Sequence, residues 1–267
     1  MEIAFCVITA VMLLVEFLRP RNEWPRVTGW AFRSLAFTAT QVLVVVGAGR
    51  LWDRWFEAHR PWSLENLGPI TGTLIAFLVL TFVSYWQHRL KHVFGFLWRF
   101  LHQVHHSPRR IELLTSFYRN PLEILVNMII MSAVLYLGVG ADAKIALNVV
   151  LLLGLADMFY HWNIRTPYWL GFFIQRPESH CIHHLRGVHA YNYGDIPIWD
   201  MLFGTFKNVR SFNGLCGFAD DNEKQIVSMF SGRDMSHGQY YHGRRAGALD
   251  PADPAIAAVA GDETTRT

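Results

Sequence analysis

Five long apolar runs dominate the first 160 residues of the chain, and short polar stretches separate them. A helix needs about 20 residues to cross the hydrocarbon core of a bilayer, and most of the runs approach that length. The last two are separated only by Gly140, Ala141 and Asp142, which predicts a tight helical hairpin. The runs cover residues 3–18, 36–48, 70–86, 122–139 and 143–160. We therefore expect an all-α, polytopic membrane protein with four or five transmembrane helices.

The composition agrees with this pattern. Hydrophobic residues make up 52% of the 267 residues, which favours a membrane protein over a soluble one. The first run has the length of a signal peptide, but it lacks a basic start and an A-x-A cleavage site, and Arg19 and Arg21 follow it directly. We expect it to be retained as a helix whose end near Arg19 is cytoplasmic.

Basic residues also predict the sidedness of a later segment. Between residues 87 and 120 a single acid, Glu112, stands against six cations: Arg89, Lys91, Arg99, Arg109, Arg110 and Arg119. Because cytoplasmic loops are enriched in Lys and Arg, this segment is predicted to face the cytoplasm, and a bacterial inner membrane is the expected location. The net charge of +3 gives no support for nucleic-acid binding once these cations are assigned to the membrane face.

Histidines gather in three short clusters, and their spacing is informative. His88 and His92 are four residues apart, directly after the third apolar run. Two further clusters share the pattern H-x-x-H-H, which places their histidines on one face of a helix. These clusters are His102, His105 and His106, and His180, His183 and His184; His161 ends the fifth run. All of them are predicted to lie at the same side of the membrane.

Metal binding explains such clusters better than a structural role does. Eight packed imidazoles without a metal would leave many buried nitrogens in need of partners, and any protonated rings would repel each other. Neutral imidazole is a good ligand for zinc, iron, copper and nickel. One zinc site uses about four protein ligands, so eight or nine histidines are enough for two metals.

Three segments carry a family resemblance. HRLKH, HQVHH and HCIHH, in that order, resemble the three histidine boxes of the fatty acid hydroxylase and sterol desaturase superfamily of membrane di-iron oxygenases. The similarity extends to WRFLHQVHHSP and to NYGDIPIWDMLFGTF, and it covers residues 84–206. It implies the following ligands: His88, His92, His102, His105, His106, His180, His183 and His184. His161 matches an additional histidine often found between the second and third boxes, and His189 is a candidate ligand or hydrogen-bond donor to the site.

The resemblance also implies an activity. A cytoplasmic helical cap would hold two irons that use O2 to insert oxygen into a lipid C–H bond or to remove hydrogens from it. Zinc has no redox chemistry for such a reaction. Hydroxylation is favoured over desaturation, and fatty-acyl, amino-lipid, sterol and carotenoid substrates remain open. No G-x-G-x-x-G precedes a helix, so a separate ferredoxin or cytochrome with its reductase is implied as electron donor. The cations near the second box either dock this carrier or face lipid headgroups.

Carboxylates and a cysteine near the boxes have less certain roles. Asp157, one turn before His161, and Asp200 are the carboxylates that we expect to orient the ligands, and for Asp200 a turn or cap role is the alternative. Residues 192–194 are expected to shape the loop behind the third box. Cys181 follows His180 and points about 100° away around the helix, so we expect it not to bind metal. The three cysteines form no C-x-x-C motif, which fits a reduced compartment.

Two other functional classes are weighed against the oxygenase. A zinc-dependent membrane hydrolase should show H-E-x-x-H, and neither HRLKH nor HQVHH contains Glu. A metal-transport protein would place its ligands within the spans, whereas these clusters lie at span ends. We expect three parts: N-terminal transmembrane helices and a loop (1–67), the catalytic domain (68–210), and a cytoplasmic extension (211–267) that is disordered from about residue 243. Residues 164–177 are expected to lie at the membrane interface.

Overall fold

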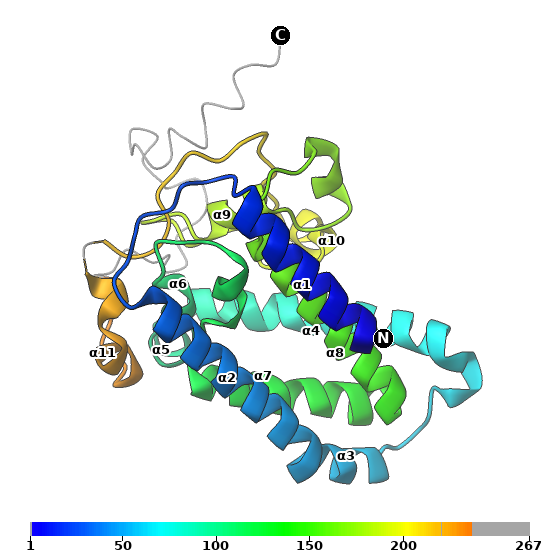
Figure 1. The fold of residues 1–267 in the computed structure, drawn as a ribbon. Coiled ribbons are helices and arrows are strands. Elements are labelled where there is room, and N and C mark those ends of the chain that lie inside the picture. Colours follow the sequence, from blue (N-terminus) through cyan, green and yellow to red (C-terminus); the bar gives the residue numbers. More distant parts are fainter. Residues whose placement is uncertain (1, 220, 237–267) are drawn as a thin grey trace.

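The computed structural model describes residues 2–219 and 221–236. Within those ranges all the regular elements are helices (Figure 1). A single isolated bridge, between Leu185 and Cys216, is the β pairing found there. The α-helices are α1 Glu2–Leu18, α2 Trp30–Ala48, α3 Arg54–Ala58, α4 Gly68–Val93, α5 Gly95–Leu97, α6 Gln103–His106, α7 Pro121–Ser132, α8 Ala143–His161, α9 Pro177–His183, α10 Pro197–Leu202 and α11 Ile226–Phe230. The π-helical segments are η1 Gly49–Asp53, η3 Trp98–His102 and η5 Ala133–Val139. The 3₁₀-helical segments are η2 Glu65–Leu67, η4 Leu113–Phe117, η6 Tyr168–Phe172 and η7 Asn222–Lys224. The all-α prediction is confirmed.

Four helical segments of the described chain are long and apolar enough to cross a membrane. They are Trp30–Ala58, Gly68–Val93, Pro121–Val139 and Ala143–His161. The first of these joins α2, η1 and α3, so the shortest apolar run of the sequence lies inside the longest span. α1 has 17 residues and is shorter, although its apolar side chains are largely exposed. Four of the expected spans are therefore present, and α1 is a further apolar helix.

The hairpin between the last two spans follows from its sequence. Gly140 ends η5 with φ of 77°, and a Cβ there would lie 2.6 Å from the carbonyl oxygen of Trp62, so only glycine fits this turn. Asp142 then caps α8 by accepting a hydrogen bond from the Ile145 amide at 2.8 Å. The predicted hairpin at residues 140–142 is confirmed.

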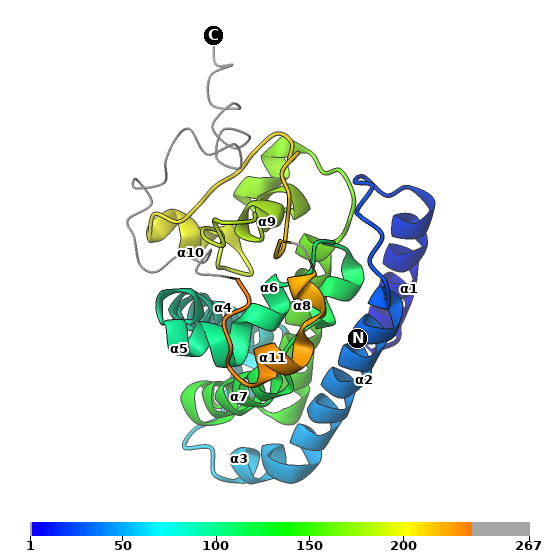
Figure 2. The same ribbon diagram turned by 90° about the vertical axis from the view of Figure 1, so that its left-hand side faces the viewer.

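The long helices form two layers. Figure 2 shows α1 and α2 together along one side, with α4, α7 and α8 beside them. α1 packs on α8, α2 packs on α7, and α4 packs on α8. Between α4 and α8 the core contains Ala76, Leu80, Ile145 and Val149, all buried. Small and branched apolar side chains therefore hold the helices together.

Short helices and loops form a cap at one end of the long helices. α5, η3 and α6 follow α4, while α9, α10 and the chain around residues 203–218 lie over the end of α8 (Figure 1). α11 packs on α6 and η3. Trp98 of η3 is fully buried in a cluster with Tyr118, Phe218 and Met229. The cap has its own core, separate from the core between the long helices.

One residue of the segment predicted to lie at the membrane interface is buried inside the protein. Trp169 and Phe173 of residues 164–177 are exposed, as a membrane-facing segment requires. Arg176, in the same segment, is instead fully buried beside Glu178. An ion pair and several hydrogen bonds to the guanidinium make that burial tolerable. The expected disorder from residue 243 falls outside the described residues.

Candidate metal centre

The cap brings nine histidines together in two groups. Within each group one ring nitrogen of every histidine lies within 4.8 Å of the others. The five-histidine group contains His88, His92, His102, His106 and His183, and the four-histidine group contains His105, His161, His180 and His184. All are buried except His88, which is partly buried. These nine are the residues that the sequence predicted as ligands, and the structure divides them into two sets.

Helix geometry explains how the boxes are divided. His105 and His106 are neighbours in α6, and successive helical residues point about 100° apart. They therefore enter different groups, and the adjacent pair His183 and His184 does the same. Each H-x-x-H-H box thus supplies ligands to both groups. The first box supplies only the five-histidine group, because His88 and His92 share one face of α4.

The two groups adjoin each other. The rings of His106 and His184, one from each group, stack with centroids 4.2 Å apart and planes 19° apart. His102 and His105 are 5.3 Å apart, and His180 and His183 are 5.0 Å apart. The arrangement is one continuous cluster with two centres of convergence.

Hydrogen bonds from Nδ1 to backbone carbonyls fix the orientation of three rings. His88 Nδ1 lies 2.8 Å from the Tyr193 carbonyl, and His183 Nδ1 lies 2.7 Å from the Tyr191 carbonyl. His161 Nδ1 lies 2.8 Å from the carbonyl of Asp157. Each acceptor requires the proton to be on Nδ1, so Nε2 of each ring carries its lone pair toward the cluster.

The loop behind the third box is built to deliver those carbonyls. Tyr191 and Asn192 have φ of 68° and 49°, in the left-handed region. The Asn192 amide holds the loop by donating to the carbonyls of Ser179 and Lys207, both within 2.9 Å. At Gly194 a Cβ would lie 2.6 Å from the Ile196 carbonyl oxygen, so this position requires glycine. Residues 192–194 thus shape the loop, in the way that their sequence suggested.

Asp200 acts on the same loop. Its carboxylate accepts from the amides of Tyr193 and Gly194, both at 2.8 Å, and from the Thr205 hydroxyl at 2.7 Å. Burial raises the pKa of Asp200 to about 6. These contacts match the turn role that was the alternative for this residue, and Asp200 supports His88 indirectly, through Tyr193.

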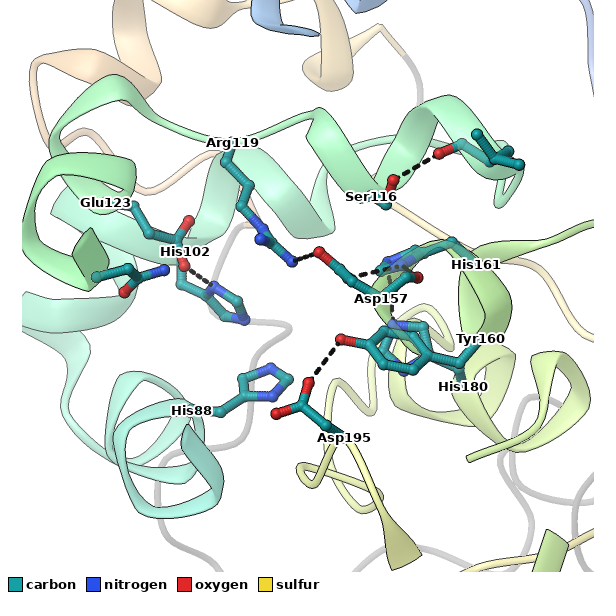
Figure 3. Close-up of polar contacts among 12 residues, drawn as sticks. His88, His102, Ser116, Arg119, Glu123, Asp157, Tyr160, His161, His180 and Asp195 are labelled. Atoms are coloured by element: carbon teal, nitrogen blue, oxygen red, sulfur yellow. Dashed lines mark hydrogen bonds and ion pairs between the residues drawn. The ribbon is translucent and has the colours of Figure 1, made fainter. Parts of the chain in front are cut away.

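Two chains of cation, carboxylate and histidine flank the cluster. Figure 3 shows Glu123 with His102 from one chain, and Arg119, Asp157 and His161 from the other. On one side Lys91 Nζ donates to Glu123 at 2.9 Å, and the same oxygen accepts from His102 Nδ1 at 2.7 Å. On the other side Arg119 donates to Asp157 at 2.7 Å, and Asp157 lies 3.2 Å from His161 Nδ1. One chain serves each group of histidines.

The structure corrects the predicted basic face and adds a residue to the site. Lys91 is only 4% exposed and is paired with Glu123, so it cannot belong to a surface that docks a carrier. Arg109 is paired with Glu223, and Arg110 with Glu112. Sequence reasoning missed Glu123 altogether. The signal was present, because a lone acid inside an apolar run is costly unless it has a role.

Among the grouped histidines, those outside the spans are neutral. Burial, reinforced by the neighbouring imidazoles, lowers the pKa of His102, His105, His106, His180 and His184 well below the ordinary value. Burial likewise lowers the pKa of His183 to about 3. Neutral imidazole is the form that binds metals, so the electrostatics of the cap suit a metal site.

Unsatisfied nitrogens test whether a metal fits. Buried ring nitrogens rarely lack partners, because an unpaired buried polar group costs about 1–3 kcal/mol. Seven nitrogens of the two groups nevertheless have no hydrogen-bond partner among the described residues: Nε2 of His88 and His183, Nδ1 of His105, His180 and His184, and both nitrogens of His92. Ligation through one nitrogen of each ring would satisfy Nε2 of His88 and His183 and one nitrogen of His92, and the all-nitrogen donor set suits a transition metal.

Distances between nitrogens support the same interpretation. His180 Nε2 lies 3.0 Å from His161 Nε2 and 3.1 Å from His184 Nε2. A single N–H cannot serve two acceptors well, whereas two nitrogens bound to one metal at about 2.1 Å and at right angles are about 3.0 Å apart. His102 and His106 show the same 3.1 Å spacing in the other group. The residues present therefore fit two metal ions.

Two further candidates lie beside the groups. His189 Nδ1 is 3.1 Å from His106 Nδ1, which places His189 behind His106 as a hydrogen-bond partner. Cys181 is buried among apolar residues that include Ile182 and Leu185, and its carbonyl accepts from Cys216 Sγ. Neither residue belongs to the two groups of converging nitrogens found in the described chain.

Known proteins share this arrangement of motifs. The family model for fatty acid hydroxylase matches residues 73–205, the segment that carries all nine histidines. Human alkylglycerol monooxygenase is 29% identical over 165 residues, which cover 59% of this chain and 34% of that protein. Ornithine lipid hydroxylase OlsE of Rhizobium tropici is 26% identical over 216 residues, 74% of this chain and 64% of that protein. Human lathosterol oxidase is 28% identical over 184 residues, 68% of this chain and 58% of that protein.

The chain spans less than two thirds of the length of each of these relatives. No solved structure matches it. The family model, the ordered histidine boxes and the relatives agree, and the four apolar helices identify an integral membrane protein. The chain belongs to the fatty acid hydroxylase and sterol desaturase superfamily.

Proposed function

We propose that this protein is an O2-dependent lipid hydroxylase that holds two iron ions in its histidine cluster. The observation that carries the proposal is the pair of adjoining groups of converging imidazoles at the end of membrane-spanning helices. The names of the relatives, which include a monooxygenase and two lipid-modifying enzymes, support the reaction class.

The donor set favours iron over zinc. Structural and catalytic zinc sites use about four ligands, and the larger group already offers five nitrogens. Two bound irons would supply the redox chemistry that an unactivated C–H bond requires. Zinc could serve a hydrolase, but a hydrolase would also need a carboxylate base beside the metal. Glu123 and Asp157 are each engaged with a histidine and a cation instead.

The reaction has a defined balance. A lipid C–H bond, O2, two electrons and two protons give a lipid hydroxyl group and water. The electrons would come from a separate ferredoxin or cytochrome with its reductase. The chain contributes orientation and shielding: Glu123 and Asp157 fix two rings, the loop carbonyls fix two more, and burial keeps water from the imidazoles.

The membrane setting of the proposal follows the sequence. Residues 87–120 carry an excess of cations, which supports a cytoplasmic position for the cap and its histidines. A bacterial inner membrane remains our proposed location. Hydroxylation is proposed ahead of desaturation, and the two reactions give products of different mass.

Metal analysis of the purified protein tests the site. Protein from iron-replete cells should contain about two irons per chain. Replacement of His183 or of His105 by Ala should remove metal from one group and abolish product formation, because each variant loses a ligand from a different group. His59→Ala is the control, since His59 is exposed and outside both groups. Zinc in place of iron, or full activity in either ligand variant, would contradict the proposal.

Lipid analysis tests the reaction. Cells with the active gene, grown under ¹⁸O₂, should contain a lipid that carries one additional labelled oxygen and that is missing from cells with the His183→Ala gene. A product lighter by two hydrogens would replace hydroxylation with desaturation. Identical lipid profiles in the two strains would contradict the proposed activity.

A further inference from the structure

A cavity of about 410 Å³ lies between the two layers of long helices. Its walls come from α1 and α2 on one side and from α4, α7 and α8 on the other. Val42 and Val46 of α2 line it and are also about half exposed on the outer, lipid-facing surface. Elsewhere the lining is mainly Val, Leu, Ile and Met. The outer part of the cavity therefore suits a hydrocarbon chain that enters from the bilayer.

The inner end of the cavity touches both histidine groups. His88 and His102 of the five-histidine group line it, as do His105 and His180 of the four-histidine group. Figure 3 shows these two sides facing each other, with Arg119 at one edge and Asp195 at the other. A ligand that fills the cavity would place its inner end between the two groups.

Charge at the inner end is already balanced. The cations that line the cavity, Lys91 and Arg119, are paired with Glu123 and Asp157 at 2.9 Å and 2.7 Å. Asp195 adds a further carboxylate to the lining. A ligand with a carboxylate or phosphate at this end would meet no unpaired cation among the lining residues, and it would be repelled by Asp195. The inner end therefore disfavours an anion.

Two polar atoms at this end have no hydrogen-bond partner in good geometry among the described residues, although the Ser84 hydroxyl lies close to the Asp195 carboxyl. Gln87 Nε2 is a donor, and Asp195 Oδ2 is an acceptor; both are buried. Gln87 is adjacent to His88 on α4, and the other oxygen of Asp195 accepts from the Tyr160 hydroxyl at 3.1 Å. Buried donors and acceptors without partners are costly, so a ligand that both accepts and donates would be favoured here.

We propose that Gln87 and Asp195 form a subsite for an uncharged hydroxyl or amide group of a single-chain lipid, whose chain fills the apolar part of the cavity. The subsite deepens the proposed function and rests on it, because it orients the substrate for the same histidines. The C–H bonds that reach the histidines are then those closest to the lipid's own polar group. The distant end of the chain remains between α2 and α7.

Ligand competition in the purified, metal-loaded protein tests the subsite without turnover. Radiolabelled hexadecanol is bound in detergent micelles, without an electron donor, and is competed with hexadecanamide, palmitate or hexadecane. Hexadecanamide should compete about as well as hexadecanol. Palmitate and hexadecane should compete about tenfold more weakly, because one is repelled and the other leaves both polar atoms unpaired.

Matched variants sharpen the test. Gln87→Leu and Asp195→Ala should each lower the preference for hexadecanol over hexadecane to within about threefold. Gln41→Leu is the control, because Gln41 is a second cavity-lining amide with an unpartnered oxygen, but it lies on α2 in the opposite layer. The Gln41→Leu variant should keep the preference of the unmodified protein for hexadecanol over hexadecane. Variants are compared at equal metal content, so that misfolded protein is not counted.

Each outcome has a clear meaning. Equal competition by hexadecane, tighter competition by palmitate, or an equal loss of preference in Gln41→Leu would overturn the subsite. The proposed function fails separately. If the preference for hexadecanol stands while no hydroxylated lipid forms, the subsite remains and the hydroxylase proposal falls.

Discussion

The spans and the cap distribute their polar and apolar side chains in opposite ways. In the spans the apolar side chains face outward, and Leu43, Leu51 and Ile70 are each more than 70% exposed. In the cap the polar side chains face inward, and the six grouped histidines that belong to it are buried there together with Arg176 and Glu178. Lipid is the solvent of the first region, so burial brings its helices little further gain.

The two regions differ in how strictly their side chains are constrained. The lipid-facing surfaces of the spans need only apolar side chains, and many residue types supply them. The cap must satisfy each buried donor and acceptor, and a single unpaired group there is expensive. Mutations should therefore have large effects in the cap and small ones on the lipid-facing surface of the spans, and three sets of substitutions measure how far this contrast holds.

The largest effect is expected at Arg176. Its guanidinium donates to Thr166, Asn208 and Val209 and is paired with Glu178 at 3.2 Å, which joins three segments beside α9. Arg176→Met should lower the free energy of unfolding by about 3–5 kcal/mol, because it leaves the Glu178 carboxylate buried with less compensation. Denaturant titration in detergent micelles measures the loss. Arg165→Met, at an exposed arginine of the same segment, should change little; equal losses would remove the contrast.

An intermediate effect is expected from the carboxylates that orient the histidines. Glu123→Gln should weaken metal binding by the five-histidine group, and Asp157→Asn should weaken binding by the four-histidine group, each about 10- to 100-fold. Each variant should retain one metal per chain after dialysis against a chelator under conditions where the unmodified protein retains both. Loss of both metals from either variant would show that the two groups are not independent.

The smallest effect is expected on the lipid-facing surface. Leu43→Ala on α2 should change the free energy of unfolding by less than about 0.5 kcal/mol, because Leu43 is 73% exposed. Leu80→Ala is the matched change in the core between α4 and α8, where Leu80 is 3% exposed, and it should cost about 2–5 kcal/mol. Comparable costs at the two positions would mean that the exposed face of α2 packs against another protein.

Much of the fold and of the site could be predicted from local patterns. Apolar run length indicates a spanning helix without reference to any other residue, and the 140–142 hairpin follows from its glycine and its capping aspartate. The histidine clusters could be found because their spacing is a property of one helix turn. Glu123 could not be assigned in this way. Its partners, Lys91 and His102, are 32 and 21 residues away in sequence, and only the packing of α4 and η3 on α7 brings them together.

The sequence by itself determined the all-α class and the membrane spans, because each depends on a pattern within a single helix. The eight histidines of the three boxes could be recognised by their spacing, and His161 was added by the family resemblance. The tertiary structure alone decided how those nine divide into groups of five and four, since that depends on which faces of α4, α6, α8 and α9 meet. It also decided that Lys91 is buried rather than exposed, and that a cavity from the bilayer ends at the histidines beside Gln87 and Asp195. Contacts between distant segments carry no periodic signal, and only the folded chain defines them.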